Sequence, residues 1–295
     1  RLSMLFDFFI VLLHILSNYL FFCKCSLHHD RTLYTLPLHL TADLIGIMDR
    51  TVEIVRVCHT STTAVEFCKT VSALIFRIHI TASEIVRLEG NDGGMIVTDS
   101  ITSSGLKQFI ENDLGGKHYR YRRGYKNVID KALELNAQGI NCPLAIETSG
   151  HAAMRENYFL DDGAYLCTKI IIKAAQMRKE GKELDELTAS LKEPLESTEI
   201  RYKILEKDFR ACGEKIIADL TKYAEEQDGW CVADDNREGI RVSFDRDNGD
   251  GWFLLRLSVH DPIMPLNVES DSEGGVKIIC DKLGEFLKTT TGLDL

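Results

Sequence analysis

A carboxylate, two hydroxyls and a histidine follow one another directly after a short apolar run in this chain. The run is Leu144–Ile146, and it leads into Glu147-Thr148-Ser149-Gly150-His151. We interpret the run as a strand, and in an open α/β sheet ligands bind outside the carboxyl ends of strands. Glu147 can accept two hydroxyl hydrogen bonds and Ser149 can both donate and accept, so the pair suits a vicinal diol. Gly150 lets the backbone approach closely. The alternative interpretation is a solvated turn.

A second candidate site lies in Leu255-Arg256-Leu257-Ser258-Val259-His260-Asp261-Pro262. Arg256 presents a planar fork of donors that matches the oxygens of a phosphate. Ser258, the nearby backbone N–H groups and His260 can complete a nest that binds an anion. The alternative interpretation is the end of a strand with an arginine on the surface.

The third candidate is basic and aromatic. Residues 117–126 hold five Lys/Arg and three Tyr. Such a segment can bind single-stranded nucleic acid, steer an anionic sugar phosphate into a cleft, or form a solvated strand edge that its charges protect from pairing. The formal net charge of the chain is −10, which opposes nucleic-acid binding, so we expect no nucleic-acid partner.

These segments lie among alternating elements, which predict an α/β fold with a parallel-type layer. The expected strands are residues 95–98, 119–122 and 143–146, and the expected helices are residues 104–112, 126–138 and 161–179. Residues 183–205 are polar and are interpreted as a short helix plus a linker. The tail then forms an α+β unit, with helices over 209–226 and 275–290 and strands over 239–244, 252–257 and 264–269. A turn at Asn248-Gly249 joins the first two of these strands. We therefore expect a three-layer α/β/α domain over 80–200 and an α+β domain over 201–295.

The first 79 residues remain without an assigned fold, and we expect an irregular or partly helical segment. Residues 4–22 are apolar but interrupted by polar side chains, so we expect a segment outside the folded core without firm membrane association. Cys23-Lys24-Cys25 with His28 and His29 lacks a second ligand pair at zinc spacing, and no metal site is predicted there.

The odd count of nine cysteines cannot fully pair. Those after residue 140 stand among apolar neighbours, which indicates reduced core thiols in a reducing compartment. We expect a cytoplasmic or plastid location. The loop from Asp245 to Arg256 resembles a calcium loop only at its start, because its twelfth residue is Arg256 rather than glutamate.

Taken together and in this order, the motifs resemble the α-D-phosphohexomutase superfamily, which includes phosphoglucomutase, phosphomannomutase and phosphoglucosamine mutase. Its sugar-recognition loop reads Gly-Glu-x-Ser-Gly-His, followed shortly by Phe-x-Asp-Asp-Gly-x-Tyr. This chain has Ile146-Glu147-Thr148-Ser149-Gly150-His151 and then Phe159-Leu160-Asp161-Asp162-Gly163-Ala164-Tyr165. Residues 97–103 and 123–126 also look like the third domain of that family. The resemblance covers roughly residues 80–295.

The resemblance implies roles for individual residues. Glu147 and Ser149 would bind sugar hydroxyls, and Arg122, Gly124 and Tyr125 would line the cleft. The fourth-domain phosphate loop of the family reads Arg-x-Ser-Gly/Asn-Thr-x-Pro, and Val259 and His260 replace its small residue and its threonine. The candidate substrate-binding residues are Arg122, Gly124, Tyr125, Glu147, Ser149, His151, Arg256, Ser258 and His260.

Two motifs of the family are missing from this sequence. A phosphoserine in Thr-Ala-Ser-His-Asn-Pro is its phosphoryl donor, and Asp-x-Asp-x-Asp-Arg holds its Mg²⁺. Here Thr81-Ala82-Ser83 is followed by Glu84-Ile85-Val86, and Ala42 to Arg50 lacks the central aspartates. We therefore predict no catalytic and no metal residue. The expected function is that of a phosphohexomutase acting on a hexose phosphate, inactive as this chain stands. The alternative is a non-catalytic sugar-phosphate binding protein.

Overall fold

The computed structural model describes residues 82–258 and 261–294. They fall into two compact units: residues 162–186 belong to one, and residues 82–161 and 187–294 belong to the other. The predictions for residues 4–22, for Cys23 to His29 and for Ala42 to Arg50 lie outside the described residues. So does His260, the last of the candidate substrate-binding residues.

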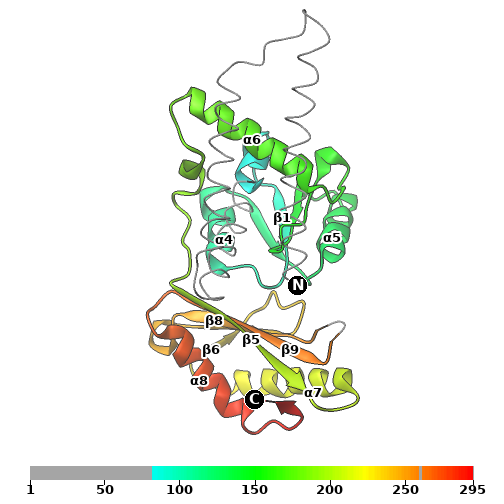
Figure 1. The fold of residues 1–295 in the computed structure, drawn as a ribbon, viewed down its shortest axis with the longest axis vertical. Coiled ribbons are helices and arrows are strands. Elements are labelled where there is room, and N and C mark those ends of the chain that lie inside the picture. The colour runs from blue at the N-terminus through cyan, green and yellow to red at the C-terminus, as the bar shows by residue number, and fades with distance from the viewer. Residues whose placement is uncertain (1–81, 259–260, 295) are drawn as a thin grey trace, which may run out of the picture. The chain divides into compact units, whose positions relative to one another are not determined.

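A four-stranded sheet of order β2-β1-β3-β4 is the framework of residues 95–154 (Figure 1). The central strand β1 (Met95–Thr98) is parallel to β2 (Lys117–Arg120) and to β3 (Leu144–Ile146), with Val97 opposite both Tyr119 and Ala145. Strand β4 (Ala152–Met154) adds an antiparallel edge. The predicted parallel α/β layer is confirmed, and because β1 and β3 run the same way, the loops after both emerge at one edge.

Two helices connect these strands. Helix α4 (Ser104–Gln108) is capped by Ser103, whose hydroxyl accepts a hydrogen bond from the Gly105 N–H at 3.2 Å, and it continues into a π-helical turn, η1 (Phe109–Asp113). Helix α5 (Tyr125–Ala137) packs on β1 and β3. Its buried residues recur at helical spacing and join Val97 and Ala145 in one core cluster; they are Val128, Ala132 and Leu135.

Helix α6 (Gly163–Lys179) is the main element of the other unit. The Asp162 carboxylate caps its start by accepting a hydrogen bond from the Tyr165 N–H at 2.9 Å. Arg178 and Lys179 lie in the last turn, where positive charge interacts favourably with the helix dipole. The predicted end of this helix at residue 179 is confirmed, and it begins at Gly163, two residues after the predicted start. A short 3-10 helix, η3 (Leu184–Thr188), follows.

A six-stranded antiparallel sheet of order β10-β5-β9-β8-β7-β6 organises the C-terminal residues. Its strands are β5 (Glu196–Ile204), β6 (Trp230–Val232), β7 (Ile240–Phe244), β8 (Gly251–Leu255), β9 (Ile263–Ser270) and β10 (Leu293–Asp294). The linker prediction for residues 183–205 is wrong over β5, which pairs with β9 from Glu196 opposite Ser270 to Lys203 opposite Ile263. Its polar residues alternate with Ile200 and Tyr202, which pack on the core. This two-residue period of a strand was not recognised in the sequence because most of its other residues are charged or polar.

One face of this sheet carries the hydrophobic core. Helices α7 (Phe209–Glu225) and α8 (Gly275–Leu287) lie along this face (Figure 1). Their buried side chains form a single cluster with the inward side chains of the strands. Side chains alternate along a strand, so the residues between these core positions point to the opposite face. On β7 and β8 they include Arg241 and Trp252, and the Arg241 guanidinium lies 3.4 Å from the centre of the Trp252 ring. The same alternation places Arg256, which follows β8, on this second face.

The five cysteines of the described residues are free thiols. Cys142 is buried, as predicted for a core thiol, whereas Cys231 is exposed and the core prediction is wrong for it. Cys231 lies on the edge strand β6 between two partly buried residues, so the alternation of that strand turns its side chain outward.

Candidate functional site

The loop after β3 is a tight reverse turn that begins at Glu147. The Gly150 N–H donates to the Glu147 carbonyl at 2.8 Å, and the Glu147 N–H donates to the His151 carbonyl at 2.9 Å. Gly150 has φ +95°, a conformation that favours glycine. The turn closes the β3–β4 hairpin, so Glu147 stands at the carboxyl end of a buried strand, where it was predicted.

The Glu147 carboxylate is the centre of this loop, and only 4% of the residue is exposed. Its Oε1 accepts a hydrogen bond from the Gly124 N–H at 2.9 Å, and its Oε2 accepts one from the Ser149 hydroxyl at 2.7 Å. The Arg123 Nε lies 3.7 Å from Oε1. The structure therefore brings together Gly124, Glu147 and Ser149, three of the predicted residues. It adds Arg123, which the sequence did not single out for the site.

Tyr125 and His151 extend the same group. Their rings are stacked with centroids 5.0 Å apart, and the His151 Nδ1 lies 2.7 Å from a carboxylate oxygen of Asp161. Tyr125 is the first residue of α5 and is 49% exposed. The pair thus presents an aromatic surface beside the Glu147 carboxylate, and an aromatic face of this kind can contact the apolar face of a sugar ring.

Asp99 is a further residue of this site for which the sequence suggested no role. It directly follows β1 and is fully buried. Its two carboxylate oxygens accept from the Thr148 N–H at 3.2 Å and from the Thr148 hydroxyl at 2.6 Å. An acid at the carboxyl end of a central strand is the signal that could have identified it. Asp99 therefore holds Thr148, the residue after Glu147, in place, and its carboxylate is already engaged by these hydrogen bonds.

Arg256 and Ser258 lie in the segment between β8 and β9. The Arg256 N–H donates to the Pro265 carbonyl at 3.1 Å, and the Ser258 N–H donates to the Ile263 carbonyl at 3.0 Å, so the strand pairing continues to this point. The Ser258 hydroxyl accepts from the Asp261 N–H at 3.3 Å. Val259 and His260, which complete the predicted anion nest, are not among the described residues.

The Arg256 guanidinium is partly desolvated. Burial lowers its pKa, and the positive charge of Arg123 lowers it further, whereas the carboxylates of Glu238, Glu199 and Asp99 raise it. Its Nε is buried without a hydrogen-bond partner among the described residues. A buried donor without an acceptor is unfavourable, so an anion at this position would satisfy it. Gly239 lies against the Arg256 backbone, and its neighbour Glu238 accepts a hydrogen bond from the Arg123 N–H, so Arg256 lies close to the group of residues around Glu147.

Arg122 is directed elsewhere. It is exposed, and its Nε donates to the Arg237 carbonyl at 3.1 Å. The neighbouring Arg120 is buried, with its guanidinium 2.6 Å from the Asp235 carboxylate. Arg120 and Arg122 of the basic segment 117–126 are therefore engaged by other residues of the same chain. The sequence had allowed three roles for this segment: nucleic-acid binding, steering of a sugar phosphate, and a solvated strand edge.

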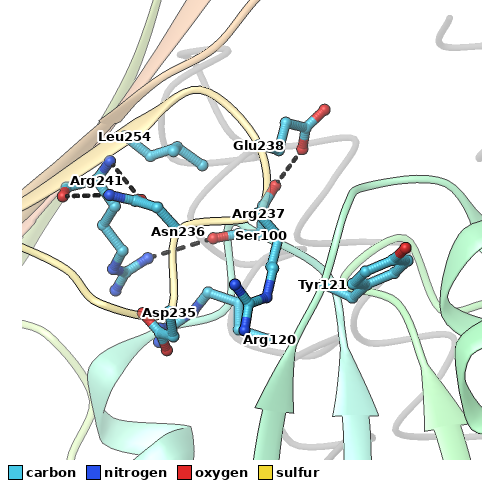
Figure 2. Close-up of a pocket in the computed structure, with 9 residues that line it drawn as sticks. All are labelled: Ser100, Arg120, Tyr121, Asp235, Asn236, Arg237, Glu238, Arg241 and Leu254. Carbon is cyan, nitrogen blue, oxygen red and sulfur yellow. Dashed lines mark hydrogen bonds and ion pairs between the residues drawn. The ribbon is translucent and has the colours of Figure 1, made fainter. Parts of the chain in front are cut away.

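The segment from Asp235 to Glu238 lines a small hollow with Ser100, Arg120 and Arg241 (Figure 2). There the Arg241 guanidinium donates to the Ser100 carbonyl at 3.3 Å, and the Ser100 hydroxyl donates to Glu238 at 2.6 Å. Glu238 also accepts from the Arg123 N–H at 3.1 Å. This hollow therefore adjoins the Glu147 group through Arg123.

The structure offers no fitted place for the Mg²⁺ of the resembled family in the part of the chain that it describes. Among residues 82–258 and 261–294, no three His, Cys, Asp or Glu side chains are grouped so that they could hold a metal ion. Ser83, from the partial phosphoserine motif, is buried within helical residues 82–88. Over the same part of the chain, no helix combines the length and the apolar character needed to cross a bilayer.

Comparison with known proteins gives matches that include residues of this candidate site. Residues 77–194 match phosphoglucomutase/phosphomannomutase, alpha/beta/alpha domain III. A phosphoglucomutase/phosphomannomutase of Thermococcus kodakarensis is 30% identical over 186 residues, which cover 63% of this chain and 36% of that protein. A phosphoglucomutase of Neisseria gonorrhoeae is 24% identical over 207 residues, or 70% of this chain and 41% of that protein.

A solved structure agrees with these matches. A phosphoglucomutase/phosphomannomutase family protein of Burkholderia thailandensis is 25% identical, with a TM-score of 0.56 over 72% of this chain and 41% of that one. The chain thus spans between 36% and 41% of the length of the two curated relatives named above. The resemblance that the motifs predicted is confirmed for the C-terminal part.

Proposed function

Since the C-terminal part of this chain is similar to the α-D-phosphohexomutase superfamily, we propose that it binds a hexose phosphate. The relatives are named for phosphoglucomutase and phosphomannomutase activity, and we assign the same class, an isomerase that transfers a phosphoryl group within a sugar, to the protein family of this chain. The sugar hydroxyls would meet Glu147 and Ser149, and the phosphate would meet Arg256 and Ser258.

One observation carries this proposal: Arg123 borders both halves of the site. Its Nε lies 3.7 Å from the Glu147 carboxylate, and its backbone N–H donates to Glu238, whose neighbour Gly239 lies so close to Arg256 that an added Cβ would be 2.8 Å from the Arg256 Cα. A carboxylate suited to hydroxyls and a guanidinium suited to a phosphate therefore face one group of residues. A hexose phosphate carries hydroxyls and a phosphate group in one molecule, whereas a simple sugar lacks the phosphate and inorganic phosphate lacks the sugar hydroxyls.

The charges favour an anionic ligand at Arg256. Burial lowers the pKa of this group, so its charged form is poorly solvated, and its Nε lacks an acceptor. A phosphate oxygen would provide a charge-assisted hydrogen bond, which contributes roughly 1.5–3 kcal/mol. The exposed ring of Tyr125 and its stacked partner His151 would contact the sugar beside Glu147.

On this proposal the residues described above orient a sugar phosphate, while the phosphoserine motif that supplies the phosphoryl group in the resembled family does not occur in the sequence. The resembled family uses a phosphoserine loop and a magnesium loop, and neither motif occurs in this chain. Transfer of a phosphoryl group depends on positioned donors and on cations that stabilise the transferring group. We therefore propose binding without turnover for this polypeptide as it stands. A non-catalytic sugar-phosphate binding protein is the alternative that shares this site.

Calorimetry with glucose 1-phosphate and with glucose 6-phosphate tests the proposed binding. We expect binding by the unaltered chain, and its loss in Glu147→Ala and in Arg256→Ala. Matched controls are Glu214→Ala and Arg246→Ala, which remove the same side chains at exposed positions. No heat at millimolar ligand, or equal binding by all four variants, would refute the site.

A coupled assay separates binding from turnover. The chain is supplied with glucose 1-phosphate and Mg²⁺, and formation of glucose 6-phosphate is followed through a dehydrogenase. We expect no product above the rate without protein. Robust product would overturn the proposal of an inactive chain while leaving the binding site in place.

A further inference from the structure

Two successive backbone N–H groups in this protein are each held by a different glutamate. The Gly124 N–H donates to Glu147 at 2.9 Å, and the Arg123 N–H donates to Glu238 at 3.1 Å. Glu147 follows β3, whereas Glu238 precedes β7, 115 residues after Arg123. The Arg123-Gly124 dipeptide is therefore fixed from two sides by segments that are distant in sequence.

Glu238 is itself held firmly. The Ser100 hydroxyl donates to the same Oε2 atom at 2.6 Å (Figure 2). The next residue, Gly239, has φ +60°, and a Cβ there would lie 2.2 Å from the Leu255 carbonyl oxygen and 2.8 Å from the Arg256 Cα. The absence of a side chain at Gly239 thus lets the backbone beside Glu238 lie directly against the backbone of Arg256.

Glu238 also acts on the group proposed to bind phosphate. Among the charges around Arg256, its carboxylate has the largest effect on the arginine pKa. Its Oε2 is engaged by Ser100 and Arg123. A carboxylate that is fixed by two donors and lies near a partly buried guanidinium can influence both the geometry of one half-site and the charge of the other.

We propose that Glu238 is a positioning residue that links the two halves of the ligand site. Its carboxylate holds the Arg123 N–H, which places Gly124 against Glu147 and so orients the Glu147 carboxylate, while its charge balances Arg256. The effect on ligand binding rests on the proposed function, whereas the effect on the Arg123-Gly124 backbone does not. Glu238 need not touch the ligand.

Two substitutions separate its hydrogen bonding from its charge. Glu238→Gln retains a carbonyl oxygen that can accept from both Ser100 and Arg123, but it removes the charge near Arg256. Glu238→Ala removes both. Glu214→Gln, at an exposed position on α7, is the control for the loss of one negative charge.

Amide hydrogen exchange of Arg123 and Gly124 in the full chain without ligand is the first measurement. We expect exchange of these amides to accelerate about tenfold or more in Glu238→Ala and to stay within about threefold of the unaltered chain in Glu238→Gln. Unchanged exchange in Glu238→Ala would overturn the positioning role. If that variant does not fold, Ser100→Ala is the substitute, because it removes one of the two donors that fix Glu238. We expect it to accelerate exchange of the Arg123 and Gly124 amides by a smaller factor. Unchanged exchange in Ser100→Ala would equally overturn the proposal.

Calorimetry with glucose 1-phosphate is the second measurement. We expect the affinity to fall about tenfold in Glu238→Ala and to be restored in Glu238→Gln to at least that of the unaltered chain, since the opposing charge near Arg256 is gone. Equal affinity in Glu238→Ala and the unaltered chain would refute the link between the half-sites. Failure of the unaltered chain to bind would instead refute the proposed function, and the exchange measurement would still decide the role of Glu238.

Discussion

Replacing Gly239 with alanine is the most direct test of the packing that carries the site. Gly239 has φ +60°, and the new Cβ would lie 2.2 Å from the Leu255 carbonyl oxygen and 2.8 Å from the Arg256 Cα. Both atoms belong to the backbone of a paired strand, so rotation of a side chain cannot relieve the overlap. The loop that carries Glu238 must move away from Arg256, or the strand must shift.

The expected cost has two parts. An L-residue in the left-handed region costs roughly 1–2 kcal/mol relative to glycine, and forcing a methyl group into packed backbone costs about 1–3 kcal/mol. Alanine lowers the entropy of the unfolded chain and so returns about 0.4–1 kcal/mol. We therefore expect Gly239→Ala to lower the free energy of unfolding by about 3 kcal/mol.

Urea unfolding followed by tryptophan fluorescence measures this change, because Trp230 and Trp252 lie in the same sheet as the strand after Gly239. Gly139→Ala is the matched control: its φ is +81°, but nothing lies within 4 Å of the added Cβ. The control should show only the conformational cost of about 1 kcal/mol. If Gly239→Ala costs no more than Gly139→Ala, the loop is not packed on the Arg256 backbone and the reasoning fails.

Three further predictions concern buried polar groups. Asp235→Ala leaves the buried Arg120 guanidinium without its carboxylate partner at 2.6 Å. We expect urea unfolding to show a free energy of unfolding lower by about 3 kcal/mol, the lower end of the usual range because Asp235 is partly exposed. Burial, and then the nearby arginines and lysine, lower the pKa of His118 well below its usual value. Below about pH 6.5 the unfolded chain therefore binds a proton that the folded chain does not, and the free energy of unfolding falls by up to about 1.4 kcal/mol per pH unit. Unfolding measured at pH 7.5 and 5.5 should show a smaller fall in His118→Phe. Burial also raises the pKa of Cys142 to about 12. Iodoacetamide at pH 8 should therefore modify the exposed Cys231 and spare Cys142 in the folded chain, as peptide mass spectrometry would show. Labelling of Cys142 without denaturant would contradict its burial.

Elements with a strong internal period were predictable from the sequence. Helices α5, α7 and α8 begin within one residue of their predicted starts, because apolar residues recur on one face of each. Strand β5 was missed, since its exposed positions carry charges and its core face consists of residues such as Ile200 and Tyr202. Strand β4 is only three residues long and follows the Glu147 turn, so no period could develop in it.

The candidate site was predictable only where its residues are close in sequence. Glu147, Ser149 and His151 belong to one motif, and the turn that joins them is local. Asp99 and Glu238 escaped because each acts across the fold: Asp99 binds Thr148, 49 residues away, and Glu238 binds Ser100, 138 residues away. Such contacts depend on which strands pair and which loops meet, and no local spacing encodes them.

The geometry also changes what Ser149 is expected to do. The sequence suggested that Glu147 and Ser149 offer two independent contacts to a diol, but the Ser149 hydroxyl donates to Glu147 at 2.7 Å. An ionised carboxylate has about four acceptor positions, and the Ser149 hydroxyl and the Gly124 N–H occupy two of them. On the proposed function, the remaining positions would accept sugar hydroxyls without either bond breaking. Ser149 and Gly124 therefore fix the direction in which Glu147 accepts. The proposed hexose phosphate would meet a carboxylate that is already oriented, so less conformational entropy of the Glu147 side chain would be lost on binding.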